Sequence, residues 1–232
     1  MKKINWWQYL IELIVVIIGI SIAFSLENWR EHQKEHQITK EYLQSLKADL
    51  MLDSVSFKQL IGRTNYSMRC ATSVRQTIEN QKIEKADSFF MNMFSMYMPL
   101  DFQASRSTID ALENSGQLNL IHNFELKKQI VSLYQHYKMI DESEEQRARG
   151  IENYYTPHLA DNYDYDAFFF SRYPMSLAEK EVLMKKALKD LTLKNMSTGV
   201  NTGLFYSKQY YQKGLYLGSD LVRAIDYELE KL

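Results

Sequence analysis

The stretch that decides the fold is Trp7–Leu26, which reads WQYLIELIVVIIGISIAFSL. Glu12 is its single charged residue. With a rise of about 1.5 Å per residue, a helix of this length extends roughly 30 Å, which matches the hydrocarbon core of a bilayer. We therefore predict a short N-terminal tail at 1–6, a transmembrane anchor at 7–26 and a soluble body at 27–232.

Two other interpretations of this stretch stay open. A cleaved signal peptide needs a small-x-small cleavage site. Ala23 and Ser25 are small enough, but Phe24 lies between them and a helical pattern follows directly. A buried helix of a globular core is the other interpretation, and it is disfavoured because no polar face interrupts residues 13–20. A retained anchor fits best.

The orientation of the anchor rests on the basic residues beside it. Lys2 and Lys3 precede the anchor together with the terminal amino group, and Arg30, Lys34 and Lys40 follow it. These counts are equal, so the positive-inside rule does not decide. We expect a cytoplasmic N-terminus, because the two lysines of the tail resist translocation. With so few residues before the anchor, nearly all of the body would then lie on the periplasmic side of a bacterial inner membrane.

Glu12 is a candidate functional residue, because ionisable side chains inside a membrane often mark ion paths or partner contacts. Gly19 and Ala23 have a small-xxx-small spacing, which allows a second helix to approach closely. The favoured interpretation, however, is that Glu12 lies shallow in the membrane, beside an interfacial belt formed by Trp6, Trp7 and Tyr9.

The composition of the chain predicts a folded body. Apolar residues make up 45% and charged residues 25% of the 232 residues, and the net charge is −1. These values argue against a disordered tail, and the lack of a basic surplus argues against nucleic-acid binding. Apolar residues recur at steps of three and four, which is typical of helices. The fold class is therefore all-α, with the anchor continuing into a long helix of a helical bundle.

Capping residues and glycines delimit the expected helices. Asp87 and Asn123 are candidate N-caps, and capping-box spacings occur at Ser107 with Asp110 and at Ser176 with Glu179. Gly214 and Gly218 predict a bend or a break in the last helix. The expected helices are a long one over about 27–81, followed by 88–98, 107–115, 123–156, 176–195 and 202–232.

Three segments resemble one family of proteins. They are ELIVVIIGISIA at 12–23, ENWRE at 27–31 and IDALENSGQLNLI at 109–121. They are similar to the patterns E-x3-V-x-I-G-x-x-I-A, N-N-W-N-E and E-L-K-S-S-G-K-L-N-L-I of an uncharacterised family of single-pass, all-helical membrane proteins from Bacteroidetes-type bacteria. Glu27 and Arg30 depart from the second pattern. The resemblance implies a retained anchor in a Gram-negative inner membrane, and it implies no activity, cofactor or catalytic residue.

Candidate metal and catalytic residues form no recognisable site. His32 and His36 share a helix face but lack a third ligand, so a solvated helix is the better interpretation. Asp161, Asp164 and Asp166 do not meet the EF-hand pattern, and a polar loop is favoured there. The phosphate-binding, nucleophile-elbow and C-x-x-C motifs are absent from the sequence. We therefore expect no enzyme activity, catalytic residue, bound metal or cofactor.

Two clusters of large apolar side chains are candidate partner surfaces. The first reads FFMNMFSMYM at 89–98, and methionine-rich faces can form adaptable grooves. The second comprises 168–170 and Tyr173. Core packing is the favoured interpretation of each, and a partner surface is the alternative. The residues of the first cluster proposed for a partner surface are Phe89, Phe90, Met91, Met93, Phe94, Met96, Tyr97 and Met98.

Taken together, these features favour a single-pass membrane-anchored scaffold or interaction protein, acting on a protein partner or as a homo-oligomer. A periplasmic ligand-sensing domain is the first alternative, and a mixed polar and apolar pocket between helices would favour it. An accessory subunit that uses the intramembrane Glu12 is the second alternative.

Overall fold

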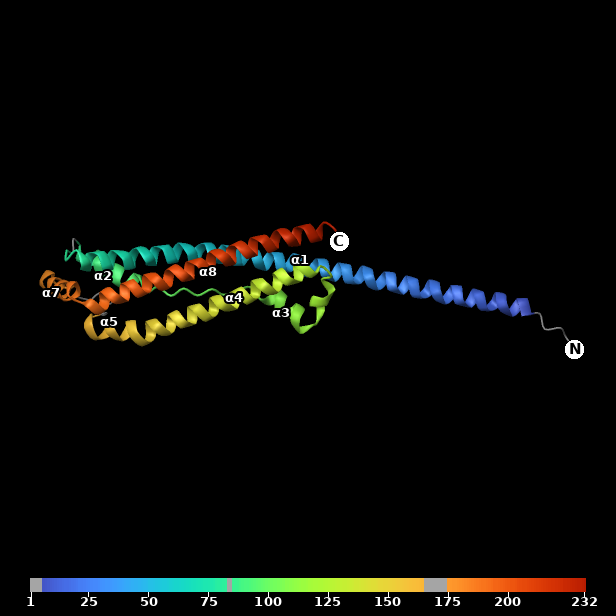
Figure 1. Ribbon diagram of the computed structural model, residues 1–232, viewed down its shortest axis with the longest axis horizontal. Coiled ribbons are helices and arrows are strands. Elements are labelled where there is room, and N and C mark those ends of the chain that lie inside the picture. Colours follow the sequence, from blue (N-terminus) through green and yellow to red (C-terminus); the bar gives the residue numbers. More distant parts are fainter. Residues whose placement is uncertain (1–5, 83–84, 165–174) are drawn as a thin grey trace.

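The structure is a computed structural model, and it describes residues 6–82, 85–164 and 175–232. Within these ranges every regular element is a helix, and none is a strand. The first helix, α1 (Trp6–Glu79), is 74 residues long. Its first part projects alone from the molecule, and its second part is a long helix of the body (Figure 1). This confirms the all-α class and the continuity of the apolar segment with the body.

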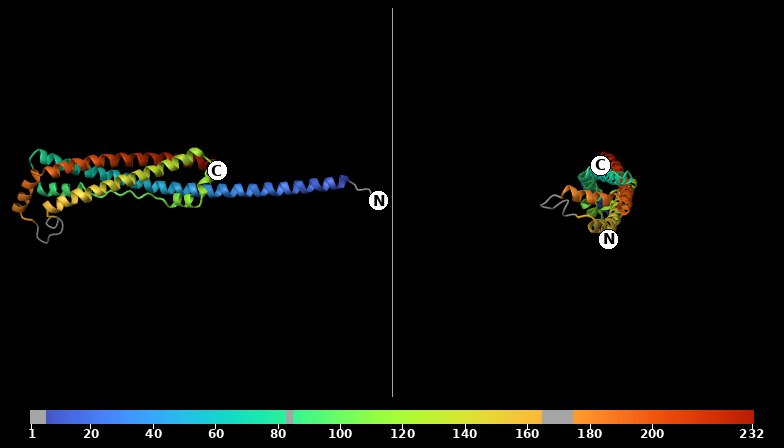
Figure 2. Two further views of the ribbon diagram at one scale, coloured as in Figure 1. Left: turned by 60° about the horizontal axis from the view of Figure 1, so that its bottom comes forward. Right: turned by 90° about the vertical axis from the view of Figure 1, so that its left-hand side faces the viewer.

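Three long helices form the body. They are the second part of α1, α4 (Phe124–Gly150) and α8 (Leu191–Leu229). The chain runs away from the anchor along α1 and α4 and returns along α8, so the C-terminus lies at the anchor end (Figures 1 and 2). At about 1.5 Å per residue, the 39 residues of α8 extend for roughly 58 Å. The body is therefore elongated and continues the direction of the anchor.

Shorter helices close the two ends of this bundle. The far end carries α2 (Ala86–Ser95) and α7 (Leu177–Leu188). Nearer the anchor lie α3 (Ser107–Asn114) and the short helix η1 (Gln117–Leu120) (Figure 1). An extended segment over residues 99–106 leads from α2 back towards α3 along the bundle. Both ends of the core are thus covered by chain.

The centre of the core is a group of aromatic side chains from four parts of the chain. Phe57 of α1 stacks on Phe102 with 4.1 Å between ring centroids, and Tyr137 of α4 meets Phe102 edge-on at 4.9 Å. Tyr211 of α8 is fully buried beside them. Aromatic rings bury large apolar areas, so this group joins the three long helices.

Gly214 determines how closely α8 approaches α1. A Cβ atom added at this residue would lie 2.6 Å from Phe57 Cζ. Helix α8 runs unbroken through Gly214 and Gly218, so the predicted bend or break is wrong. Because Gly214 has no side chain, α8 can pack closely against α1. The burial gained in the bundle outweighs the lower helix propensity of glycine, so the helix continues.

The start of α3 is held from another helix. The expected capping box at Ser107 is wrong, because Ser107 is the first helical residue and the N-cap is Arg106, whose side chain makes no capping hydrogen bond. Instead, Asp49 of α1 accepts a hydrogen bond from the Thr108 N–H at 3.2 Å. A carboxylate at this position satisfies a helix N–H group and interacts favourably with the helix dipole.

Helix α8 begins eleven residues before the expected position, and α7 ends before position 195. Asp190 has an extended backbone, and its carboxylate accepts a hydrogen bond from the Leu193 N–H at 2.8 Å. This N-cap separates the two helices and starts the second. The predicted capping box of Ser176 and Glu179 is present at the start of α7. Helix α2 begins after Lys85, so Asp87 lies inside it and is not its cap.

The helical path of α4 continues beyond the predicted end near Pro157. A π-helix, η2 (Ile151–Tyr155), follows α4 directly and leads into α5 (Thr156–Asn162). Proline cannot donate the backbone hydrogen bond to the residue four positions earlier. The wider π-turn comes immediately before Pro157, at the point where that hydrogen bond is missing. It turns Tyr155 towards Gly199 of α8.

Candidate functional site

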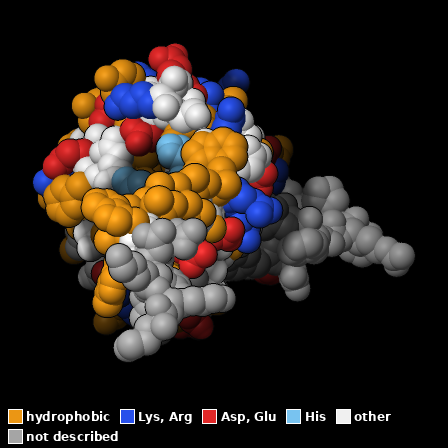
Figure 3. Space-filling model, turned by 90° about the vertical axis from the view of Figure 1, so that its right-hand side faces the viewer, with side chains coloured by type: hydrophobic (Ala, Val, Ile, Leu, Met, Phe, Trp, Pro, Cys, Tyr) orange, Lys and Arg blue, Asp and Glu red, His pale blue; other side chains and the backbone are white. Residues whose placement is uncertain are grey.

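The first part of α1 has no contact that buries it. Every residue from Leu10 to Lys34 is exposed, and this part of the helix is long and apolar enough to cross a membrane. Seen from the anchor end, apolar side chains gather at the front, and charged side chains surround them (Figure 3). The segment is therefore a candidate membrane span.

Trp29 marks a second boundary of this span. Its side chain is 61% exposed, and it lies one turn beyond the last apolar residue, Leu26. From Trp7 to Trp29 the helix extends about 33 Å, which places tryptophan at both interfaces of a bilayer of ordinary thickness. Thr39 is the first fully buried residue of the body, about 20 Å beyond Leu26. If this segment spans a bilayer, the body lies outside the hydrocarbon core.

Glu12, Gly19 and Ala23 lie on the exposed part of α1. A Cβ atom added at Gly19 would meet no atom within 4 Å. Within the described part of this single chain, these three residues contact no second helix. Their assignment to a partner or an ion path stays a prediction.

The methionine-rich segment lies mostly in the core. Phe89, Phe90, Met93 and Met96 are each at most 4% exposed. Core packing is therefore the correct interpretation of these four residues, and a partner surface is wrong for them. Phe94, Tyr97 and Met98 are half-buried, and only Met91, at 54%, is open to solvent among the apolar residues of 89–98. The second cluster, 168–170 with Tyr173, lies outside the described residues.

The histidine pair at 32 and 36 stays on the exposed helix, where His32 lies 3.7 Å from the Glu35 carboxylate. Asp161 and Asp164 are described, but Asp166 is not. Among the residues that the structure describes, no group of three or more His, Cys, Asp or Glu side chains is arranged to hold a metal ion.

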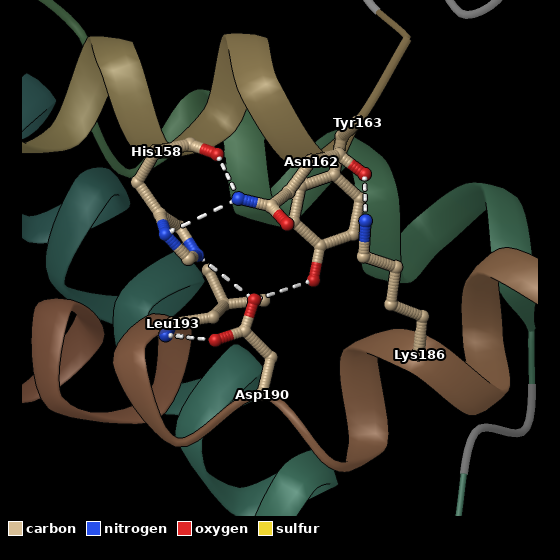
Figure 4. Close-up of polar contacts among 6 residues, drawn as sticks. All are labelled: His158, Asn162, Tyr163, Lys186, Asp190 and Leu193. Carbon is tan, nitrogen blue, oxygen red and sulfur yellow. Dashed lines mark hydrogen bonds and ion pairs between the residues drawn. The ribbon is translucent and has the colours of Figure 1, made fainter.

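His158, absent from the expected sites, belongs to a polar cluster at the far end of the body (Figure 4). Its Nε2–H donates to Asp190 Oδ2 at 2.8 Å, and the Tyr163 hydroxyl donates to the same oxygen at 2.9 Å. The Asn162 amide faces His158 Nδ1 at 3.4 Å. Burial alone would raise the pKa of Asp190, but hydrogen bonds from the Leu193 N–H, His158 and Tyr163 lower it below its ordinary 3.8.

Both ring nitrogens of His158 are thus occupied, and both oxygens of Asp190 accept hydrogen bonds. A catalytic base needs a ring nitrogen free to meet a substrate. The cluster fastens α5 to the start of α8, and Lys186 of α7 adds a hydrogen bond to the Asn162 carbonyl oxygen at 2.9 Å. Its role is to hold these helices together.

A different arrangement surrounds Arg147, near the end of α4. One guanidinium nitrogen donates to the Leu100 carbonyl oxygen at 2.9 Å. The buried Nε–H of the same group has no hydrogen-bond partner among the described residues. None of the described carboxylates lies within ion-pair distance of Arg147, which is half-buried. Burial lowers the pKa of this guanidinium, because a desolvated charge is costly.

Glu144 lies one helical turn before this arginine, and its carboxylate is used elsewhere. It accepts hydrogen bonds from the Tyr211 hydroxyl and, at 2.9 Å, from the Phe102 N–H. Burial raises the pKa of Glu144 above its ordinary 4.5. Glu144 therefore ties α4 to α8 and to the extended segment, and it compensates Arg147 only from beyond ion-pair distance.

Arg147 borders a pocket of about 380 Å³ between α4 and α8. On α8 the wall includes Gly199 and Gly203, four residues apart. A Cβ atom at Gly203 would meet nothing within 4 Å, whereas one at Gly199 would lie 3.0 Å from the Tyr155 hydroxyl, so only Gly203 leaves open space. Ile151 and Tyr155 of the π-helix close one side. Among the described residues that line this pocket, Arg147 is the only charged one. Single π-helical turns inside α-helices are frequent at functional sites, and here such a turn borders the pocket.

A second pocket, of about 610 Å³, lies on the other side of Arg147. It is lined by acids from α4, the π-helix and the extended segment, so its character is opposite to that of the first pocket. These acids are Asp101, Asp141, Glu144, Glu145 and Glu152.

Sequence reasoning did not identify the pocket between α4 and α8. Arg147 lies in the polar run EEQRARG, which is typical of a solvated helix. The four-residue spacing of Gly199 and Gly203 was the available signal, since small residues at this spacing allow close approach between helices. Only the fold brings these glycines opposite Arg147.

Of the three comparisons with known proteins, one gives a match. No curated protein and no solved structure matches the chain. A family model described as a family of unknown function (DUF6090) matches residues 12–191, from the anchor to the first residue of α8. Since this match spans well over half of the sequence, the chain belongs to this family of unknown function.

Proposed function

We propose that this protein is a membrane-anchored ligand-binding protein, whose body lies in the periplasm of a Gram-negative bacterium and acts through a protein partner. The observation that carries the proposal is the pocket between α4 and α8. It is mixed in character, with apolar side chains, hydroxyl groups and one half-buried guanidinium. Pockets of a few hundred Å³ with a few polar groups are the usual form of small-molecule sites.

The helix arrangement supports a sensing role. One wall of the pocket is α8, and α8 packs along the second part of α1. The same α1 continues without a break through the candidate membrane span. A ligand that preferred one spacing of α4 and α8 would shift the population of that spacing and so the position of α1.

The test is to ask what the protein carries in its native membrane. The full chain is purified from native membranes into nanodiscs, and the small molecules released on denaturation are identified by mass spectrometry. Gly203→Val fills the pocket, since a Cβ atom there meets nothing within 4 Å. Gly62→Val is the matched control, because Gly62 is an exposed helical glycine with equally open surroundings.

The expected result is a compound that is retained by the wild type and by Gly62→Val and is at least fivefold depleted in Gly203→Val. Equal amounts of every released compound in all three proteins would contradict ligand binding at this pocket.

A scaffold formed by copies of this chain is the second candidate. It is favoured by three neighbouring exposed apolar residues of α1, namely Met51, Leu52 and Val55, which are each more than half exposed. A common anchor holds all copies at the same height, which raises their effective concentration. Crosslinking of Leu52→Cys in native membranes tests this candidate. Recovery of the chain crosslinked to itself supports it, and recovery of monomer alone contradicts it.

A further inference from the structure

The pocket between α4 and α8 has one charged group and a largely apolar wall with open space at Gly203, and together they specify a class of ligand. We infer that it binds a small organic anion, whose carboxylate or phosphate pairs with Arg147 and whose apolar part lies against Gly203 and the apolar side chains beside it. This inference rests on the proposed ligand-binding function and adds the charge and the orientation of the ligand.

The first argument is the unfilled hydrogen-bonding capacity of Arg147. A guanidinium has five N–H donors, and a half-buried one is costly unless it is paired. Among the described residues, Arg147 makes one hydrogen bond, to the Leu100 carbonyl oxygen, and its buried Nε–H has no partner. The Nε–H and a neighbouring N–H of an arginine match the two oxygens of a carboxylate or phosphate.

The second argument is the distribution of negative charge around Arg147. The acids near it line the other pocket, and the two oxygens of Glu144 are engaged by Tyr211 and by the Phe102 N–H. The pocket between α4 and α8 has no acidic side chain among its described lining residues. An anion in this pocket therefore meets a single positive charge and no acid among the described lining residues, whereas the lining of the second pocket includes five acids.

The third argument is the apolar and aromatic character of the remaining wall. Val200 and Leu204 of α8, Ile151 of the π-helix and Met96 border the pocket, with Tyr155 and Tyr210 beside them. Such a wall suits the hydrocarbon or ring portion of a metabolite and gives inorganic phosphate little to contact. The ligand should thus be an anion with an apolar body and not a free inorganic ion.

Three probes of equal size separate the charge classes. Benzoate, benzamide and benzylamine share a ring and carry a negative, a neutral and a positive group at pH 7. Each is titrated against the full chain in nanodiscs by ligand-observed NMR, in Tris chloride without phosphate or carboxylate. Benzoate is expected to bind at least fivefold more tightly than benzamide, and benzylamine more weakly than either.

Two variants locate the effect. Arg147→Gln should abolish the preference for benzoate over benzamide, whereas Arg149→Gln should keep it, because Arg149 is exposed and paired with Glu145 at 2.7 Å. Gly203→Val keeps Arg147 and should weaken binding of both benzoate and benzamide at least fivefold. Circular dichroism and thermal unfolding show whether each variant is folded. If Arg147→Gln is unfolded, Gly203→Val carries the test.

The outcomes distinguish this inference from the proposed function. Equal or tighter binding of benzamide or benzylamine overturns the anion assignment. A benzoate preference that survives Arg147→Gln also overturns it, as does benzoate binding that Gly203→Val leaves unchanged. If a neutral or cationic compound co-purifies with the wild type and not with Gly203→Val, ligand binding stands and only the anion assignment fails. If no probe binds the wild type, the anion assignment fails. If in addition no compound co-purifies, the proposed function fails with it.

Discussion

The two parts of α1 are one continuous helix with opposite surroundings. From Leu10 to Lys34 every residue is exposed, whereas from Thr39 onwards buried residues recur at three- and four-residue steps. Within the first part, residues 13–26 are apolar on all sides, and the second part has a single apolar stripe. The surroundings therefore follow from how the apolar residues are distributed, and not from how many there are. A helix that is apolar on all sides is compatible with lipid, whereas a helix with one apolar stripe packs in a helical bundle.

The largest expected difference between the two parts is the cost of removing a phenylalanine ring. Phe57 is 1% exposed and stacked on Phe102, so Phe57→Ala should lower the free energy of unfolding of the body by about 3–5 kcal/mol. Phe24 is 66% exposed, and Phe24→Ala should change it by less than about 0.5 kcal/mol. Thermal and denaturant unfolding of the full chain in nanodiscs measures both. Equal losses would mean that the anchor packs on the body.

Two glycines on long helices give the next largest difference. Gly214→Ala places a Cβ atom 2.6 Å from Phe57 Cζ, and such overpacking should cost about 1–3 kcal/mol. Gly62→Ala meets nothing within 4 Å and replaces glycine in an exposed part of α1, so it should stabilise the body by about 0.5–1 kcal/mol. The same unfolding measurement compares them. A stabilising Gly214→Ala would contradict the close approach of α8 to α1.

These contacts separate what the sequence predicts from what it does not. The Asn123 N-cap and the capping box of Ser176 and Glu179 are local signals, and both are present as predicted. The cap of α3 is Asp49, 59 positions from the N–H that it binds, and no local pattern identifies it. Asp190 also carries a local signal, because Asp is a common N-cap residue and an apolar helical pattern follows it.

The candidate site could not be predicted because, like the contact of Asp49 with α3, it joins residues that are far apart in the sequence. The candidate membrane span is a local property of twenty residues, so the apolar run alone was sufficient to predict it. Arg147, Tyr155 and Gly203 come from three segments that meet only when α8 returns along α4. The polar run around Arg147 is typical of a solvated helix, and only the packed bundle shows that the guanidinium is half-buried.

The pH dependence of stability offers a smaller test, at Asp53 in the buried part of α1. Its carboxylate is 1% exposed and accepts from the Ser105 N–H at 2.8 Å, and the Tyr137 hydroxyl approaches without reaching hydrogen-bonding geometry. Burial raises the pKa of Asp53 above its ordinary 3.8. The folded state therefore binds this proton more tightly than the unfolded state does, and its stabilising effect is complete below pH 3.8.

That effect is lost as the pH rises through the folded-state pKa of Asp53. Asp53→Asn keeps an acceptor for the Ser105 N–H and removes the charge. Relative to this variant, the wild type should lose stability from about pH 4 upwards and then reach a constant difference once Asp53 is ionised. Denaturant unfolding at several pH values measures this. A difference that does not change with pH would contradict the desolvation of Asp53.

Glu12 in the anchor should show the smallest effect on the body. Within the described residues, no part of the apolar stretch around it is buried, so Glu12→Gln should leave the free energy of unfolding of the body unchanged within about 0.5 kcal/mol. Gln costs less than an ionised Glu inside lipid, so retention in membranes during alkaline extraction should be equal or greater. Weaker retention would indicate that Glu12 pairs with a group on another membrane helix. The acid would then have a function that the single chain does not display, and the exposed part of α1 would be an interface and not only an anchor.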